Sequence, residues 1–326
     1  MNERNIVALL HSRFGSLLMA LIAVAATVVS FISGNISHIP GDSGTWLLSA
    51  NEWITNPSIS LIASLLTNIG VAALLIYINK QYNVLRSVSH LFAGMFLIMQ
   101  MAQPAIFGQF HNGTLLCVTV ILSTAILFST FNRPFPRQPI FLIFLMLCVG
   151  TMSQYAFAFY IPLFMLGCGQ MRIFDIKTFT AALIGIITPL WIMWGFGLIS
   201  VNDFKMPQLV NMFEVLNDKE TIQLVVTTAF TVLLLFSMGI LNLMRVYNLN
   251  SQMRAFNGFL SILSFATAIC VIADFRNMET YVPLLNCCAA FQVGHFFVVN
   301  TQRRSYIAIL AIIAIYATLY WWSTVV

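Results

Sequence analysis

The chain has 326 residues, of which 60% are hydrophobic and 8% are charged, and its formal net charge is +5. Soluble domains carry about a quarter charged residues, so this composition excludes a water-soluble globular protein. The basic residues stand singly or in pairs beside apolar runs and form no patch, which argues against a nucleic acid partner. The composition therefore predicts membrane lipid as the surroundings of the chain.

Apolar runs separated by short polar segments make up most of the sequence. Because a bilayer core of ~30 Å needs about 20 apolar residues per helix, they predict an all-α polytopic bundle of about eleven spans. A signal peptide is the alternative for the first run, but no small-residue cleavage site closes it, which favours a retained helix. We expect a single integral membrane domain over residues 1–326, with spans at 14–32, 58–79, 88–103, 113–131, 139–153, 154–169, 178–200, 221–244, 256–273, 281–300 and 305–323.

The stretch from Pro139 to Gly169 allows two interpretations, one long tilted helix or two short helices that meet near residues 151–155. Pro139 suits the start of a helix, where its missing N–H would be unpaired in any case. Two short helices preserve the alternation of charge on both flanks, and we adopt that interpretation.

Charge predicts the orientation. If the spans alternate from a cytoplasmic N-terminus, twelve of the fifteen basic residues fall inside and eight of the ten acidic residues fall outside. The positive-inside rule therefore predicts an inner N-terminus and an outer C-terminus, which requires an odd number of spans. The inner basic residues are Arg4, Arg13, Lys80, Arg86, Arg133, Arg137, Arg172, Lys177, Arg245, Arg254, Arg303 and Arg304.

The first outer loop, residues 34–57, brings acidic residues and two tryptophans together. Asp42 or Ser43 can cap a short helix in which Trp46 and Trp53 are seven residues apart and share a face. Indole rings prefer the membrane interface, so we expect this helix to lie flat there.

Such a helix would hold two candidate catalytic carboxylates, those of Asp42 and Glu52, at the lipid boundary. The alternative is structural: Asp42 caps the helix, which is a usual role for Asp at such a position, and Glu52 is merely solvated.

A second polar cluster lies between the third and fourth spans and contains Gln100, Gln103, His111 and Asn112. Amides within a span are costly unless they face protein or water, so Gln100 and Gln103, one turn apart, should point into the bundle. His111 would then lie near the mouth of an outward cavity, with Gln103 and Asn112 as candidate substrate-binding residues. Interhelical hydrogen bonding by the amides and a solvated loop histidine are the alternative.

The turn before the tenth span holds Arg276, the third candidate substrate-binding residue. An arginine here could pair with a lipid phosphate. Pairing with Asp274 or Glu279 is the simpler expectation.

Within the tenth span, Cys288, Gln292 and His295 share one stripe of the helix. His295 has two interpretations: it is a functional group, or it is a neutral histidine whose hydrogen bonds are satisfied by a neighbouring helix. No Asp, Glu, Lys or Arg lies near the middle of a predicted span, which argues against a pump with a carboxylate relay. The six cysteines lack metal-ligand spacing and are expected to be small core residues; no motif for a metal or cofactor occurs.

Scattered residues of the central half of the chain carry a resemblance. They run from Gln103-Pro104 through Arg133 and the short pair of helices to Phe174-Asp175-Ile-Lys177 and Ile184-Gly-Ile-Ile-Thr-Pro189. This arrangement resembles a family of uncharacterised multi-pass bacterial inner-membrane proteins. The resemblance implies a location in the bacterial inner membrane and no particular activity.

More loosely, an acidic first outer loop followed by many short-looped spans is similar to the C-type (GT-C) glycosyltransferases, which use polyprenyl-phosphate-linked sugars. In that family an acidic residue of the first outer loop is the catalytic base, and Asp42 is the matching position. The chain departs from the pattern, because Asp42 is not part of an acidic pair and no large C-terminal outer domain follows.

Two hypotheses follow. In the first, the protein transfers or polymerises a lipid-linked sugar at the outer leaflet: Asp42 accepts a proton from the acceptor hydroxyl, His111 or Glu52 assists, and Arg276 holds the lipid phosphate. In the second, it is a non-catalytic scaffold or a lipid-handling protein whose polar groups stabilise helix packing.

Overall fold

A computed structural model describes residues 3–34, 36, 45–85, 89–134, 136–200, 204–205, 219–246, 250–299 and 305–325, and every regular element in these ranges is helical. The all-α prediction is therefore confirmed. The α-helices are α1 (Glu3–His11), α2 (Arg13–Ile32), α3 (Pro57–Tyr82), α4 (Leu91–Met101), α5 (Pro104–Phe107), α6 (Asn112–Ser129), α7 (Arg137–Ser153), α8 (Tyr160–Gln170), α9 (Ile176–Gly195), α11 (Lys219–Val246), α12 (Ser251–Ala273), α13 (Met278–Val299) and α14 (Ser305–Val325). The 3-10 helices are η1 (Ala50–Glu52), η2 (Tyr155–Phe159) and η4 (Phe275–Asn277).

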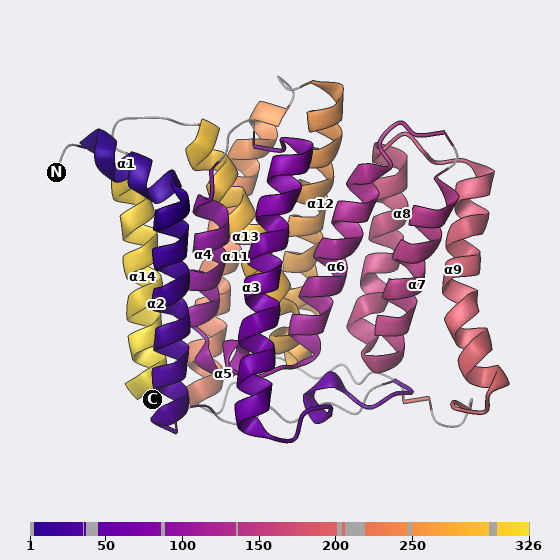
Figure 1. Ribbon diagram of the computed structural model, residues 1–326, viewed down its shortest axis with the longest axis horizontal. Helices are drawn as coiled ribbons and strands as arrows, with labels where there is room; N and C mark the ends of the chain where they lie inside the picture. Colours follow the sequence, from indigo (N-terminus) through magenta and orange to yellow (C-terminus); the bar gives the residue numbers. More distant parts are fainter. Residues whose placement is uncertain are drawn as a thin grey trace.

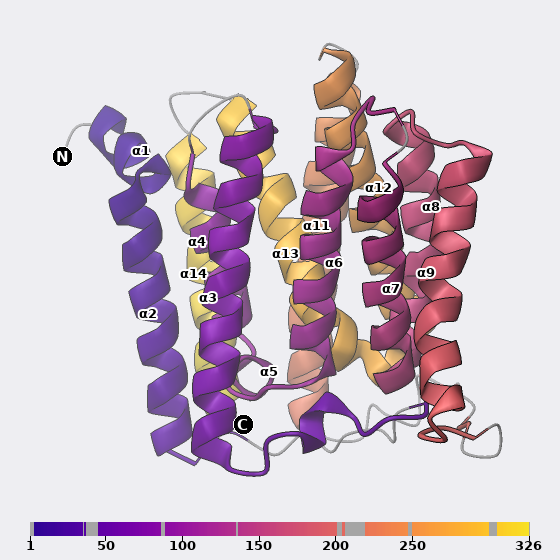
Figure 2. The same ribbon diagram turned by 45° about the vertical axis from the view of Figure 1, so that its right-hand side comes forward.

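Eight helical segments of the described chain are long and apolar enough to cross a membrane. They are α2, α3, α6, α9, Thr221–Met244 of α11, α12, Phe275–Val298 and α14. Three shorter apolar helices lie among them: α4, α7 and Tyr155–Gln170. The long helices run side by side between two faces of the bundle (Figures 1 and 2), as expected for a multi-pass, membrane-embedded protein.

A break at Gln154 divides the stretch from Pro139 to Gly169. The backbone of Gln154 is extended, with φ −152° and ψ 128°, and η2 and α8 follow it. The interpretation as two short helices is confirmed.

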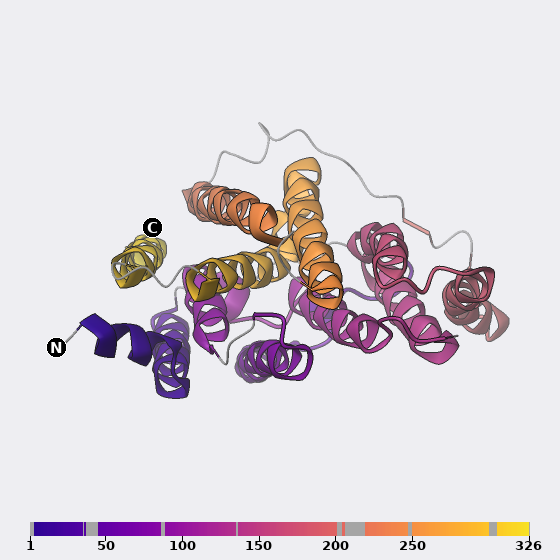
Figure 3. The same cartoon turned by 90° about the horizontal axis from the view of Figure 1, so that it is seen from above.

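The long bundle is organised around α13 (Figure 3), which packs against α4, α6, α11 and α12. Cys287, Cys288, Ala289 and Ala290 are buried on α13, and small residues such as these let neighbouring helices approach closely. The helices α2 and α14 lie at one end of the bundle, and α7, α8 and α9 lie at the other. The cysteines are free, and five of the six are buried, as the sequence predicts.

Buried amides cross-link this core. Gln100 Nε2 donates to Asn68 Oδ1 of α3 at 3.2 Å, and Gln100 Oε1 accepts from Asn286 Nδ2 of α13 at 3.1 Å. Gln292 Oε1 of α13 accepts from Asn242 Nδ2 of α11 at 2.9 Å. An unpaired buried amide is costly, so these bonds fix the register of the helices. The prediction that Gln100 points into the bundle is confirmed.

Charge distinguishes the two faces of the bundle. The face where α2, α7, α9 and α12 begin is called the basic face, because its described residues include Arg13, Lys80, Arg133, Arg137, Arg172, Lys177 and Arg254. The face that carries residues 45–56 is called the opposite face.

The expected interfacial helix of the first loop is replaced by an irregular segment. Within the described residues 45–56, the one regular element is η1. The N–H groups of Trp46 and Leu47 donate to Met152 O of α7 at 3.1 and 2.9 Å, and Thr45 Oγ1 donates to the same oxygen at 2.8 Å. These groups are satisfied by the end of α7, so they form no helical bonds within the loop.

Candidate functional site

Asn112 joins the first-loop segment to the bundle at the opposite face. Its side chain accepts from Ala50 N–H at 3.0 Å and donates to Ser49 Oγ at 2.8 Å. Its own N–H donates to Asn51 Oδ1 at 2.9 Å, and Ser153 Oγ of α7 donates to its Oδ1 at 3.3 Å. This candidate substrate-binding residue therefore uses its polar atoms to hold the loop, α6 and α7 together.

His111 is buried and caps α6. Its Nδ1 accepts from Gly113 N–H at 2.8 Å, and its Nε2 lies 3.1 Å from Ile106 O. Since Nδ1 is the acceptor, the neutral ring donates through Nε2. Burial lowers the pKa of His111 from 6.5 to about 4. His111 is therefore an interior capping group rather than a solvated residue at the mouth of a cavity.

Stability is expected to fall as the pH decreases from about 6.5 to about 4. In this window the unfolded chain binds a proton at His111 that the folded chain does not bind, and the total loss is about 3 kcal/mol. Thermal unfolding in detergent across this window measures the effect. His111→Asn keeps a capping acceptor and removes the titration, so its profile should be flatter by that amount. An equal slope in the two proteins would contradict the assignment.

Asp274, between α12 and η4, holds the second cluster of the opposite face. Its side chain is 3% exposed. Its Oδ2 accepts from Tyr155 Oη at 2.7 Å and from Tyr281 Oη at 3.0 Å, while its Oδ1 accepts from Asn277 Nδ2 at 3.1 Å. The Asn277 amide also contacts the Tyr155 hydroxyl. We call Tyr155, Asp274, Asn277 and Tyr281 the Asp274 cluster; it joins η2 to the beginning of α13.

The remaining candidates lie in different surroundings. Glu52 in η1 and Arg276 in η4 are exposed on the opposite face. Gln103 is 2% exposed and donates to Thr228 Oγ1 of α11 at 3.2 Å; its Oε1 has no hydrogen-bond partner among the described residues. The prediction that Gln103 points into the bundle is confirmed. Asp42 lies outside the described residues.

The Asp274 cluster was not identified as a site from the sequence. The sequence marks residues 151–155 only as a helix break and Asp274 only as a partner for Arg276, whereas the Asp274 carboxylate bonds to Tyr155, 119 residues away in the chain. The signal available in the sequence was an acidic residue directly beside an apolar span, where a buried carboxylate needs donors.

The end of α9 forms one side of a hollow on the opposite face. Gly197 has φ +68°, and the N–H groups of Gly197 and Leu198 donate to Trp194 O and Met193 O at 3.0 and 2.9 Å. This is the Schellman arrangement, for which glycine is preferred because of its positive φ. It ends α9 and leads the chain on to Ile199 and Ser200.

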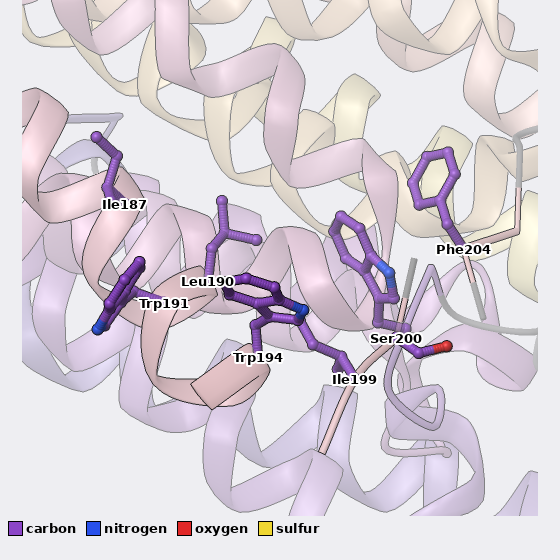
Figure 4. A pocket seen from close by; sticks show the side chains of 8 residues that line it. Ile187, Leu190, Trp191, Trp194, Ile199, Ser200 and Phe204 are labelled. Atoms are coloured by element: carbon purple, nitrogen blue, oxygen red, sulfur yellow. The ribbon is translucent and has the colours of Figure 1, made fainter. Parts of the chain in front are cut away.

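The resulting cavity, called the tryptophan groove, has a volume of about 630 Å³ (Figure 4). Trp46 of the first-loop segment forms part of its wall and lies 4.9 Å from the ring of Phe204, centroid to centroid. Lys205 N–H donates to Thr45 O at 3.2 Å and joins these two segments. The groove is lined by Trp46, Ile187, Leu190, Trp191, Trp194, Ile199, Ser200 and Phe204.

Comparison of the chain with family models, curated proteins and solved structures finds no match. The resemblances given by the sequence therefore stay predictions. The fold and the opposite face place the protein in a class, the all-helical membrane-embedded proteins with several spans. Its described polar residues on the opposite face are largely engaged in packing, and the tryptophan groove is apolar.

Proposed function

We propose that the protein is an eleven-pass membrane protein that handles lipid at the outer leaflet, with the apolar chain of a lipid in the tryptophan groove. The basic face is then cytoplasmic, the N-terminus is inside and the C-terminus is outside, as the positive-inside rule requires. In this arrangement α4, α7 and Tyr155–Gln170 cross together with the eight longer spans. A bacterial inner membrane is the location that the family resemblance implies.

The observation that carries the proposal is the lining of the groove. Apart from Ser200 and the indole N–H groups, its side chains are hydrocarbon or aromatic. Its volume of about 630 Å³ falls within the range of about 300–1,000 Å³ that is usual for ligand pockets. Tryptophan favours the boundary between headgroups and acyl chains, which is where a lipid chain would enter such a groove.

Narrowing or opening the groove is expected to reduce lipid capture by about tenfold, or ~1.4 kcal/mol, the scale of one lost aromatic contact. The full chain, purified in detergent, is incubated with a lipid that carries a photoactivatable diazirine on its chain, and labelled peptides are mapped. Ile199→Trp should fill the groove, and Trp46→Ala should remove one wall.

Trp321→Ala is the matched control, because Trp321 is 69% exposed on α14 at the other end of the bundle. In Trp321→Ala, diazirine labelling of α9 should equal that of the unaltered protein. Labelling of α9 that is insensitive to both groove variants would overturn the proposal.

A GT-C-like transferase is the second candidate, because the first loop supplies both Asp42 and, four residues later, the groove residue Trp46. A polyprenyl-phosphate sugar would place its chain in the groove, Asp42 would act as base, and Arg276 would hold the phosphate. Glu52 is the better assistant, since His111 is engaged at both ring nitrogens. Two results together would favour this candidate. Asp42→Asn would lose transfer of a labelled sugar, and lipid photolabelling of α9 would persist in the same variant.

A further inference from the structure

A second hollow lies on the basic face, between the first turns of α7 and α9. Its volume is about 450 Å³. Two cationic side chains from different helices, Arg137 and Lys177, line it together with Gln138 and Thr180, and the apolar residues Phe141, Ala181 and Ile184 form the rest of its wall. We call it the basic groove.

The packing of α7 and α9 fixes this groove. The two helices lie side by side at one end of the bundle, and Cys148 Sγ of α7 contacts Ile186 O of α9 at 3.1 Å. At the start of α9, Asp175 Oδ1 accepts from Ile176 N–H at 2.7 Å and caps the helix.

The cationic and apolar parts of the groove match the two parts of an anionic lipid, its phosphate and its acyl chain. Arginine presents a planar set of donors that matches a phosphate, and lysine adds a point charge. The apolar wall continues from these cations along α7 and α9 into the bundle side that faces lipid, since Ile184 is 57% exposed. Basic pockets between membrane helices on the cytoplasmic side commonly hold anionic headgroups.

We infer that the basic groove binds an anionic glycerophospholipid, with its phosphate between Arg137 and Lys177 and an acyl chain along Phe141, Ala181 and Ile184. The site lies at the other end of α9 from the tryptophan groove and recognises charge, so it rests on the proposed function only for the cytoplasmic placement of the basic face. Charge complementarity together with the apolar wall selects a lipid over a soluble phosphate.

The test uses the full chain reconstituted in nanodiscs of phosphatidylcholine with or without phosphatidylglycerol, and native mass spectrometry counts the retained phosphatidylglycerol. The double variant Arg137→Gln, Lys177→Gln is expected to lower retention by about tenfold or more. Ile184→Trp narrows the groove from its apolar wall, at an exposed position, and leaves both charges in place. This variant should also lower the retention of phosphatidylglycerol.

The matched control is the double variant Lys80→Gln, Arg133→Gln, which removes the same charge from exposed positions of the same face outside the groove. Its retention should change less than twofold. An equal loss of phosphatidylglycerol in both double variants would show that the positive charge of the whole basic face attracts the lipid, without a specific site. That result would overturn the inference. So would full displacement of the lipid by millimolar inorganic phosphate, or unchanged retention in Ile184→Trp.

Failure here is distinguishable from failure of the proposed function, because diazirine labelling at the tryptophan groove is measured separately in the same variants. A double variant that unfolds is recognised by its melting temperature. Ile184→Trp then decides the outcome alone, since its position faces away from the core.

Discussion

Replacing Asp274 by alanine is expected to lower the free energy of unfolding by about 4 kcal/mol. The substitution leaves the hydroxyl groups of Tyr155 and Tyr281 and the amide of Asn277 without the acceptor that they share in the buried cluster. A buried donor that loses its partner costs about 1–3 kcal/mol, and Tyr281 and Asn277 cannot turn to water because they are 0% and 7% exposed. Thermal unfolding followed by tryptophan fluorescence measures the loss.

The matched control is Glu52→Ala, an exposed carboxylate on the same face, which should change stability by less than about 0.5 kcal/mol. Tyr281→Phe removes one donor only and should cost about 1–2 kcal/mol. If Asp274→Ala were no worse than Glu52→Ala, the cluster would contribute nothing to stability, and the hydrogen bonds would have to be reassigned.

Substitution of Gly113 by alanine should be the second most damaging change, at about 2–3 kcal/mol. A Cβ at this position would lie 2.8 Å from both Glu279 O and Thr280 O, and 2.5 Å from His111 Cε1. The two carbonyl groups belong to the first turn of α13 and cannot move without it. The first turn of α6 must therefore shift, and overpacking of this kind costs about 1–3 kcal/mol before the altered His111 cap is counted.

Gly70→Ala provides the control, because no heavy atom beyond the surrounding backbone of α3 lies within 4 Å of the Cβ that it would add. Alanine has the higher helix propensity, so this variant should be as stable as the unaltered protein or up to about 1 kcal/mol more stable. Both variants are compared by melting temperature in one detergent. If Gly113→Ala had the same melting temperature as Gly70→Ala, the close approach of α6 and α13 would be ruled out.

The sequence predicts the all-helical class and eight long apolar helices because hydropathy and length identify such segments. The span predicted at 256–273 is found within α12, the helix break falls at Gln154, and Gln100 and Gln103 face the interior. Each of these features follows from the local run of residues and from the cost of an unpaired polar group in lipid.

The opposite face was less predictable because contacts between distant segments decide it. The segment that begins at Thr45 bonds to the Met152 carbonyl of α7 only after the bundle has formed, so the helix expected in the first loop does not appear in its described part. Likewise, Trp46 and Phe204 belong to two segments whose sequences give no sign that they meet. Composition indicates that such residues lie at the interface, and only tertiary structure brings them into one groove.

The central position of α13 has a consequence for biosynthesis. Its four neighbours, α4, α6, α11 and α12, all precede it in the chain, so the core closes around a helix that is made next to last. Gln100 meets its partner Asn286 only after 186 further residues, which at 5–20 residues per second takes about 10–40 s. During that interval the Gln100 side-chain carbonyl must be accommodated by water, by the insertion machinery or by a temporary neighbour, so α4 needs such help until α13 has been made.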